Sequence, residues 1–385
     1  MRRFIFPLTC ILTFMLTTMM IAFSTQAASA ENVNVQATSA ILTEMRTGRV
    51  LYEKNANKRL PMASTTKIMT AITAIENCNI NAVVTASAKA VNVEGSKMYL
   101  KEDEKITYRD LLYGLMLNSG NDAANVIAES ISGSNEQFAS LMNKTAKKIG
   151  LKDTNFTNPS GLHDENHYTT ANELAVIMRY AMKNEEFAKI TSTVSISVSV
   201  NLDDGKRLLS NHNKLLKTYE GCIGGKTGYT TAAGRCLVST AKRGDTMLIA
   251  VTLNDGNDWN DHKKMLDYGF ENVKTTIIQQ AGDLNIEIPV ISDNDDKTGT
   301  YIKNDIDITT FNNGNTETEL IYILPDFIYA PVEKDKPIGK IILLLKNKII
   351  CEEIIFTKND VENTKVISKR KINIFDKIKK MIKSA

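Results

Sequence analysis

The stretch PMASTTKIMTAITAIE, residues 61 to 76, decides how the chain is interpreted. Its Ser64 and Lys67 stand three residues apart, and the apolar residues after them repeat with the period of a helix. The stripe that we expect to be buried is Ile68, Met69, Ile72 and Ile75. Because residues i and i+3 share a helix face, the Lys67 amine is within reach of the Ser64 hydroxyl. A serine with a base beside it is an activated nucleophile.

The SxxK spacing alone is a weak signal, because it occurs at two further places in this chain. Ser239 and Lys242 lie in an apolar strand pattern, where residues three apart point to opposite faces. Ser368 lies in a basic tail. Only the copy at Ser64 opens a helix, so we take it as the candidate nucleophile.

Length and composition indicate an ordinary globular protein with room for two domains: 385 residues, of which 43% are hydrophobic and 24% charged. The net charge of +3 does not single out nucleic acid as a partner. The cysteines lack metal-site spacing and indicate at most one disulfide. The segment HDENH, residues 163–167, lacks the glutamate that zincins carry beside the first histidine. We therefore expect no metal and no cofactor.

Both ends of the chain predict a position outside the cytoplasm. Residues 1–30 have two arginines, an apolar run and a final Ala-Ser-Ala, the layout of a cleaved signal peptide. The alternative is an uncleaved anchor, since the run from Phe4 to Phe23 is about as long as a spanning helix. Residues 367–385 form a basic amphipathic helix pattern, which predicts attachment to the outer face of the cell membrane. The alternative there is a solvated tail.

The pattern between the ends predicts an α/β (α+β) fold with a central antiparallel sheet flanked by helices, over residues 31–274. Residues 33–56 read as a hairpin, 107–150 as three helices, and the region from 221 to 253 as three neighbouring antiparallel strands. Residues 275–366 show short strand patterns without helices, which predicts a small β domain.

Two further motifs follow the Ser64 helix in order: Ser119-Gly120-Asn121, on a loop between helices, and Lys226-Thr227-Gly228, on a strand. Decoys match the same letters at 292–294 and 297–299. These two lie within one acidic turn segment, so a helix loop and a separate strand could not supply them. We assign both decoys to a surface loop.

The set SxxK, SxN and KTG resembles that of penicillin-binding proteins and serine β-lactamases. The loop NPSGLHDENHYTT and the run NHNKLL before GGKTGYT extend the resemblance to the D-alanyl-D-alanine carboxypeptidases of the low-molecular-weight penicillin-binding protein class. It covers most of residues 35 to 275. The block EGCIGGKTGYTTAAGRCLVS looks most like the sporulation-associated members of that family.

The resemblance implies a β-lactamase/transpeptidase-like catalytic domain and an acyl transfer. Ser64 would attack the carbonyl of a peptidoglycan stem peptide ending in D-Ala-D-Ala, and β-lactam antibiotics would acylate the same serine. Lys67 must then be neutral to accept the serine proton. Lowering a lysine pKa to near 7 costs about 4 to 5 kcal/mol, which burial and a second cation, Lys226, would supply.

The resemblance also implies roles for the other motif residues. Ser119 would relay a proton toward the departing nitrogen, and Asn121 would hold the substrate amide. Thr227 would receive the terminal carboxylate with the neighbouring lysine. Gly228 would leave room for substrate along the strand edge. The backbone N–H groups of Ser64 and Tyr229 would form the oxyanion hole.

Three other functions remain open from the sequence. A serine β-lactamase shares all three motifs, although residues 151 to 175 offer no clear deacylating glutamate; Glu165 belongs to the matched carboxypeptidase loop. A D,D-endopeptidase acting on cross-linked muropeptides would use the same residues. A non-catalytic wall-binding scaffold is disfavoured because every motif residue is present.

Overall fold

The computed structural model describes residues 33–202, 205–292, 296–311, 317–345 and 347–362. The predicted signal peptide and the basic amphipathic tail lie outside these residues. Within the described part of the chain, no helix is long and apolar enough to cross a membrane.

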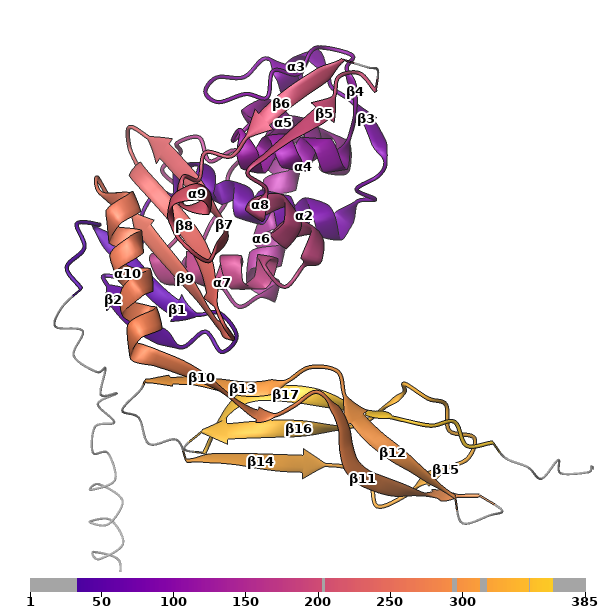
Figure 1. Ribbon diagram of the computed structural model, residues 1–385. Helices are drawn as coiled ribbons and strands as arrows, with labels where there is room; N and C mark the ends of the chain where they lie inside the picture. Colours follow the sequence, from indigo (N-terminus) through magenta and orange to yellow (C-terminus); the bar gives the residue numbers. More distant parts are fainter. Residues whose placement is uncertain (1–32, 203–204, 293–295, 312–316, 346, 363–385) are drawn as a thin grey trace, which may run out of the picture.

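The chain up to α10 (Asp258–Asn272) is organised around one antiparallel sheet of five strands, in the order β2-β1-β9-β8-β7 (Figure 1). Its strands are β1 (Ser39–Glu44), β2 (Val50–Lys54), β7 (Cys222–Thr230), β8 (Gly234–Arg243) and β9 (Thr246–Leu253). The predicted sheet, built from the hairpin near residue 40 and the three strands after residue 221, is confirmed. β7 forms one edge of this sheet.

Alternating residues of the sheet pack into two cores because successive side chains point to opposite faces. Ile41, Ile249 and Val251 face the cluster of α2, α4, α5, α6 and α7, whereas Leu42 and Leu248 face α10. The helices of the first layer are α2 (Lys67–Asn77), α4 (Tyr108–Leu117), α5 (Asn121–Ser132), α6 (Asn135–Lys148), α7 (Ala171–Ala181) and α8 (Glu185–Ser192). α10 (Asp258–Asn272) covers the other face.

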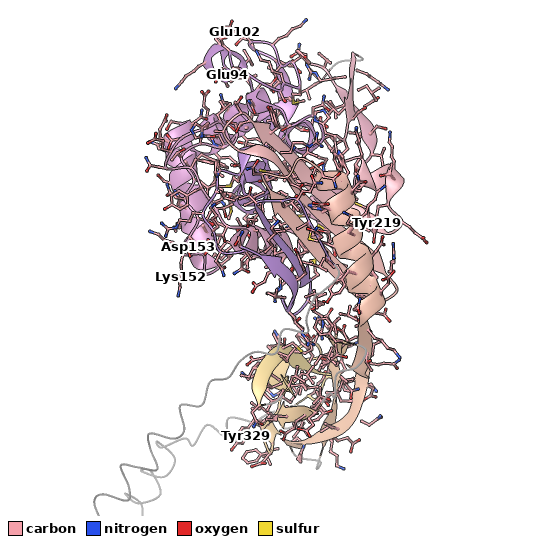
Figure 2. The ribbon with its side chains drawn as sticks, turned by 90° about the vertical axis from the view of Figure 1, so that its left-hand side faces the viewer. Glu94, Glu102, Lys152, Asp153, Tyr219 and Tyr329 are labelled. Carbon is pink, nitrogen blue, oxygen red and sulfur yellow. The ribbon has the colours of Figure 1, made fainter. Side chains whose placement is uncertain are left out.

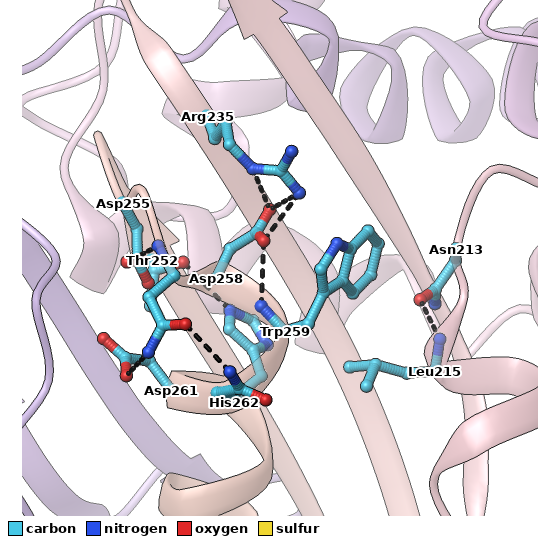
Figure 3. Close-up of polar contacts among 11 residues, drawn as sticks. Asn213, Leu215, Arg235, Thr252, Asp255, Asp258, Trp259, Asp261 and His262 are labelled. Atoms are coloured by element: carbon cyan, nitrogen blue, oxygen red, sulfur yellow. Dashed lines mark hydrogen bonds and ion pairs between the residues drawn. The ribbon is translucent and has the colours of Figure 1, made fainter.

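Polar contacts fix α10 to the sheet (Figure 3). Arg235 of β8 makes an ion pair with Asp258 at 2.7 Å, and the Asp258 carboxylate also accepts from the Trp259 N–H. His262 is fully buried, with Nδ1 2.6 Å from Ser239 Oγ and Nε2 3.1 Å from the Thr252 hydroxyl. Ser239 is therefore a structural residue of the sheet, as the sequence indicated.

Local capping explains where the predicted helices begin. The side chains of Thr107, Ser134 and Thr170 each accept a hydrogen bond from a backbone N–H in the first turn of the following helix. The three helices expected over 107–150 are confirmed as α4, α5 and α6. Residues 192–200 also carry a strand pattern in the sequence, and β5 (Ser195–Ser199) lies within them. The other short elements were not expected: β3 (Val83–Thr85), α3 (Ala88–Val91), β4 (Lys105–Thr107), β6 (Lys206–Ser210) and α9 (Leu215–Thr218).

The region after α10 consists of strands in the described residues, as predicted. β10 (Val273–Gln279) pairs with β13 (Ile306–Phe311), and a larger sheet has the order β14-β16-β17-β12-β11-β15. The strands of that sheet are β11 (Gly282–Ile291), β12 (Lys297–Ile302), β14 (Thr318–Ile323), β15 (Ile328–Tyr329), β16 (Pro337–Leu345) and β17 (Lys348–Thr357). An ion pair of 2.6 Å between Arg46 and Asp307 joins this region to the hairpin β1-β2. Figure 2 shows Tyr329 in the β region and Glu102 at the opposite end of the molecule.

The second decoy motif does not lie in a loop, so that expectation is wrong. Lys297 to Gly299 open β12, which pairs in antiparallel fashion with β11. Thr298 is fully buried in the β region, and Lys297 makes an ion pair with Glu287. Ser292 of the first decoy donates a hydrogen bond to Asp296 at 2.7 Å, whereas residues 293 and 294 lie outside the described part of the chain. The second decoy thus belongs to the β region and not to the five-stranded sheet.

Candidate active site

Ser64 lies on a short 3-10 turn, Ala63–Thr66, and α2 begins only at Lys67. The expectation that Ser64 itself opens the α-helix is therefore wrong, because the 3-10 turn precedes the helix. In a 3-10 turn, side chains at i and i+3 eclipse one another, so the spacing brings the two groups together directly. Lys67 Nζ lies 3.0 Å from Ser64 Oγ.

The Lys67 side chain is buried, and three oxygens surround its amine. Besides Ser64 Oγ, Nζ donates to Asn121 Oδ1 at 2.8 Å and to the Ser160 carbonyl at 2.6 Å. Burial holds the pKa of Lys67 well below its usual value, the positive charge of Lys226 lowers it further, and Asp122 opposes both. The structure therefore provides both causes that the sequence interpretation required for a neutral lysine.

The second motif is placed by the turn between α4 and α5. Ser119 adopts a left-handed conformation with φ 57°, and Asn121 is the first residue of α5. The Asn121 amide donates to the Glu94 carbonyl at 2.8 Å, which leaves its oxygen directed at Lys67. Ser119 is buried, and within the part of the chain that the structure describes its hydroxyl has no hydrogen bond to either lysine.

The third motif lies on the edge strand β7. Lys226 is buried, which lowers its pKa to about 7, and its amine donates to the Thr227 carbonyl at 2.8 Å. The charge of Lys226 in turn lowers the pKa of Lys67, so the pair favours a single positive charge.

β7 runs directly against the turn that carries Ser64. A Cβ added at Gly228 would lie 3.0 Å from the backbone nitrogens of both Ser64 and Thr65. A glycine is therefore required for this close approach. Tyr229, the next residue, is 67% exposed. β7 pairs with β8 on one side and has no strand partner on the other within the described sheet. Its Gly225 exchanges hydrogen bonds with the Thr191 hydroxyl of α8.

The sequence interpretation missed the loop that supports the turn from behind. Ser160 contributes only its carbonyl, which no residue pattern marks, and Gly161 touches the Ala63 carbonyl so closely that an added Cβ would overlap it. His167 bonds to Thr66 at 2.8 Å. Its position in HDENH was visible in the sequence, but only as a rejected metal motif.

The same loop bears on the rejected metal interpretation. His163 and Glu165 are exposed, whereas His167 is buried, so the two histidines do not face a common site. In the described residues no group of histidine, cysteine, aspartate and glutamate side chains is arranged to hold a metal ion. Cys78, Cys222, Cys236 and Cys351 are free thiols in the structure.

Comparisons with known proteins agree with this geometry. A family model described as D-alanyl-D-alanine carboxypeptidase matches residues 24–257, and one described as the C-terminal domain of penicillin-binding protein 5 matches residues 274–363. The chain is 34% identical to the D-alanyl-D-alanine carboxypeptidase DacF of Bacillus subtilis, over 86% of this chain and 88% of the relative. It is 30% identical to DacA of Haemophilus influenzae, over 91% of this chain and 93% of the relative.

Solved structures show the same fold across both regions. Penicillin-binding protein 5 from Haemophilus influenzae has a TM-score of 0.64 and 30% identity, covering 86% of this chain and 98% of that one. The D-alanyl-D-alanine carboxypeptidase DacD from Francisella tularensis has a TM-score of 0.62 and 29% identity, covering 86% and 95%.

Proposed function

The chain belongs to the D-alanyl-D-alanine carboxypeptidase family, and from that membership we propose that it removes the terminal D-alanine from peptidoglycan pentapeptides through an acyl-enzyme on Ser64. The observation that carries this proposal is the buried Lys67 amine, 3.0 Å from Ser64 Oγ in a site that lowers the lysine pKa. β-Lactams would acylate the same serine, because their strained amide presents a carbonyl to the same nucleophile.

The first half of the reaction forms the acyl-enzyme. Neutral Lys67 takes the proton of the Ser64 hydroxyl while Ser64 Oγ bonds to the carbonyl carbon of the penultimate D-alanine. The C–N bond to the last D-alanine breaks, and the leaving nitrogen receives a proton through Ser119. Water then attacks the ester, Lys67 takes its proton, and Ser64 recovers its hydroxyl.

Substrate orientation falls to the other motif residues. Lys226 in its charged form and the Thr227 hydroxyl would bind the terminal carboxylate, and Asn121 would hold the peptide amide. The N–H groups of Ser64 and Tyr229 would stabilise the oxyanion. The approach of Gly228 to the Ser64 nitrogen supports this, since it brings β7 beside the nucleophile.

Product analysis distinguishes this reaction from cutting of cross-links. Purified protein is incubated with a pentapeptide and, separately, with a cross-linked muropeptide, and the products are weighed by mass spectrometry. We expect loss of one alanine from the pentapeptide, with the cross-linked substrate largely intact. Faster cleavage of the cross-link would make the protein an endopeptidase, and rapid turnover of nitrocefin would make it a β-lactamase.

We further propose that the catalytic domain spans residues 31–274, followed by a β domain over 275–366, and that the protein is exported and held on the outer face of the cell membrane by residues 367–385. Support comes from the lysines and apolar residues of that tail and from the family match. Deletion of 367–385 should release the protein from washed membranes into the soluble fraction. Continued membrane attachment of the truncated chain would contradict the anchor and point to the N-terminal run.

A further inference from the structure

A buried histidine lies directly behind the turn that carries Ser64. His167 is 3% exposed and packs edge-on against the Phe156 ring, with the centroids 5.8 Å apart. It belongs to the loop whose Ser160 carbonyl accepts from Lys67. The reaction described above assigns it no role.

The hydrogen bonds of His167 fix its tautomer. The backbone N–H of Thr157 can only donate, and it donates to Nδ1 at 3.1 Å. Nδ1 therefore carries a lone pair, and the ring proton is on Nε2. Nε2–H then donates to Thr66 Oγ1 at 2.8 Å.

Thr66 passes this constraint to the residue before the nucleophile. With its oxygen engaged as an acceptor, the Thr66 hydroxyl donates to the Ala63 carbonyl at 2.8 Å. Ala63 has φ 48°, a left-handed conformation that a non-glycine residue keeps only when its surroundings hold it there. The chain from His167 to Ala63 is such a restraint.

The Ala63 carbonyl shares a peptide plane with the Ser64 N–H. In a planar trans peptide these two groups point in opposite directions, so anchoring the oxygen on the loop side directs the N–H to the other side. On that side lies β7, where Gly228 approaches the Ser64 nitrogen. The Ser64 N–H is also one of the two donors expected to meet the oxyanion.

We propose that His167 is a positioning residue that, through Thr66 and the Ala63 peptide, aims the Ser64 N–H at the oxyanion. The inference rests on the proposed function, because it assumes that Ser64 is acylated. Burial keeps the ring neutral by lowering the pKa of His167 to about 4; the charges of Lys67 and His163 act the same way, and Asp164 opposes them.

The test compares penicillin acylation by His167→Ala, Thr66→Val and the double variant in the full chain. A fluorescent penicillin at several concentrations separates the dissociation constant of the first complex from the acylation rate constant. Each single change should slow acylation at least tenfold, since complete loss of an oxyanion donor costs roughly 100- to 1,000-fold. The dissociation constant should stay within about twofold.

The double variant distinguishes a relay from two separate packing defects. If His167 acts through Thr66, the double variant should be no slower than the slower single one, because the chain is already broken. Thr66→Ser, which keeps the hydroxyl, should retain acylation within a few fold. His163→Ala, on the exposed part of the same loop, is the matched control and should react as the unmodified chain does.

Several results would overturn the inference while leaving the function intact. They are losses that multiply in the double variant, a weakened first complex with normal acylation, or unchanged kinetics in Thr66→Val. Thr66→Val is close in volume to the original residue and covers the case in which His167→Ala fails to fold. An unmodified chain that does not react with penicillin would instead refute the function, and the positioning role with it.

Discussion

Lys226 should set the alkaline limit of activity, because only its charged form binds the terminal carboxylate of the substrate. Its pKa is lowered to about 7, so the charged form is lost as the pH rises through that value. The charged fraction falls from about one half at pH 7 to about one hundredth at pH 9. We therefore expect kcat/KM for an acylated D-Ala-D-Ala peptide to drop roughly 50-fold over this interval.

Lys226→Arg tests the cause of this fall in kcat/KM above pH 7, since arginine stays charged across the whole pH range. The variant should keep a flat kcat/KM between pH 7 and pH 9, whatever its absolute rate. The same peptide with a C-terminal amide lacks the carboxylate, so its kcat/KM with the unmodified chain should not fall between pH 7 and pH 9. A fall in kcat/KM near pH 7 that persists in Lys226→Arg would refute the reasoning.

Three further outcomes are expected. Burial lowers the pKa of His262 to about 3 and that of His167 to about 4, whereas both titrate at about 6.5 in the unfolded chain, so each should cost roughly 2 kcal/mol of stability as the pH falls from 7 to 5. His262→Gln should remove its share of this slope, with unfolding followed by the fluorescence of Trp259, the single tryptophan; an unchanged slope would contradict the burial effect. Gly161→Ala should slow penicillin acylation at least tenfold, because its new Cβ overlaps the Ala63 carbonyl; acylation at the usual rate would show that the loop does not hold the turn. Lys297→Ala should leave carboxypeptidase activity within twofold, and a large loss would overturn its assignment to the β region.

The sequence allowed the main elements of the fold to be predicted because each carried a local signal. The apolar repeat after Lys67 predicted α2, and the pattern of residues 107–150 predicted α4, α5 and α6. The hairpin β1-β2 and the neighbouring strands β7, β8 and β9 followed from their alternation and from the short turns between them. The pairing of β1 with β9 joins segments far apart in the sequence, so no local signal predicted it. The missed elements, such as β3 and α3, are three or four residues long, too short for a periodic pattern.

The site was predictable as far as side chains of a recognised spacing define it. Ser64, Lys67 and Asn121 meet as expected, and the neighbouring charge of Lys226 contributes to the lowered pKa of Lys67. The Ser160 carbonyl was not predictable, because any residue has one and only the fold brings it to the lysine. The decoy at Lys297 shows the converse. Its sequence matches the KTG motif and it lies on a strand, as that motif should, but the strand belongs to the β region and not to the sheet beside Ser64.

The central claim, that Ser64 is the nucleophile, is tested most directly by mapping the site of penicillin attachment. The purified chain is reacted with penicillin, digested, and its peptides are weighed, alongside the Ser64→Ala variant treated in the same way. We expect one equivalent of adduct on the peptide that contains Ser64, and none on the variant. An adduct on another serine, or one that survives in Ser64→Ala, would contradict the account.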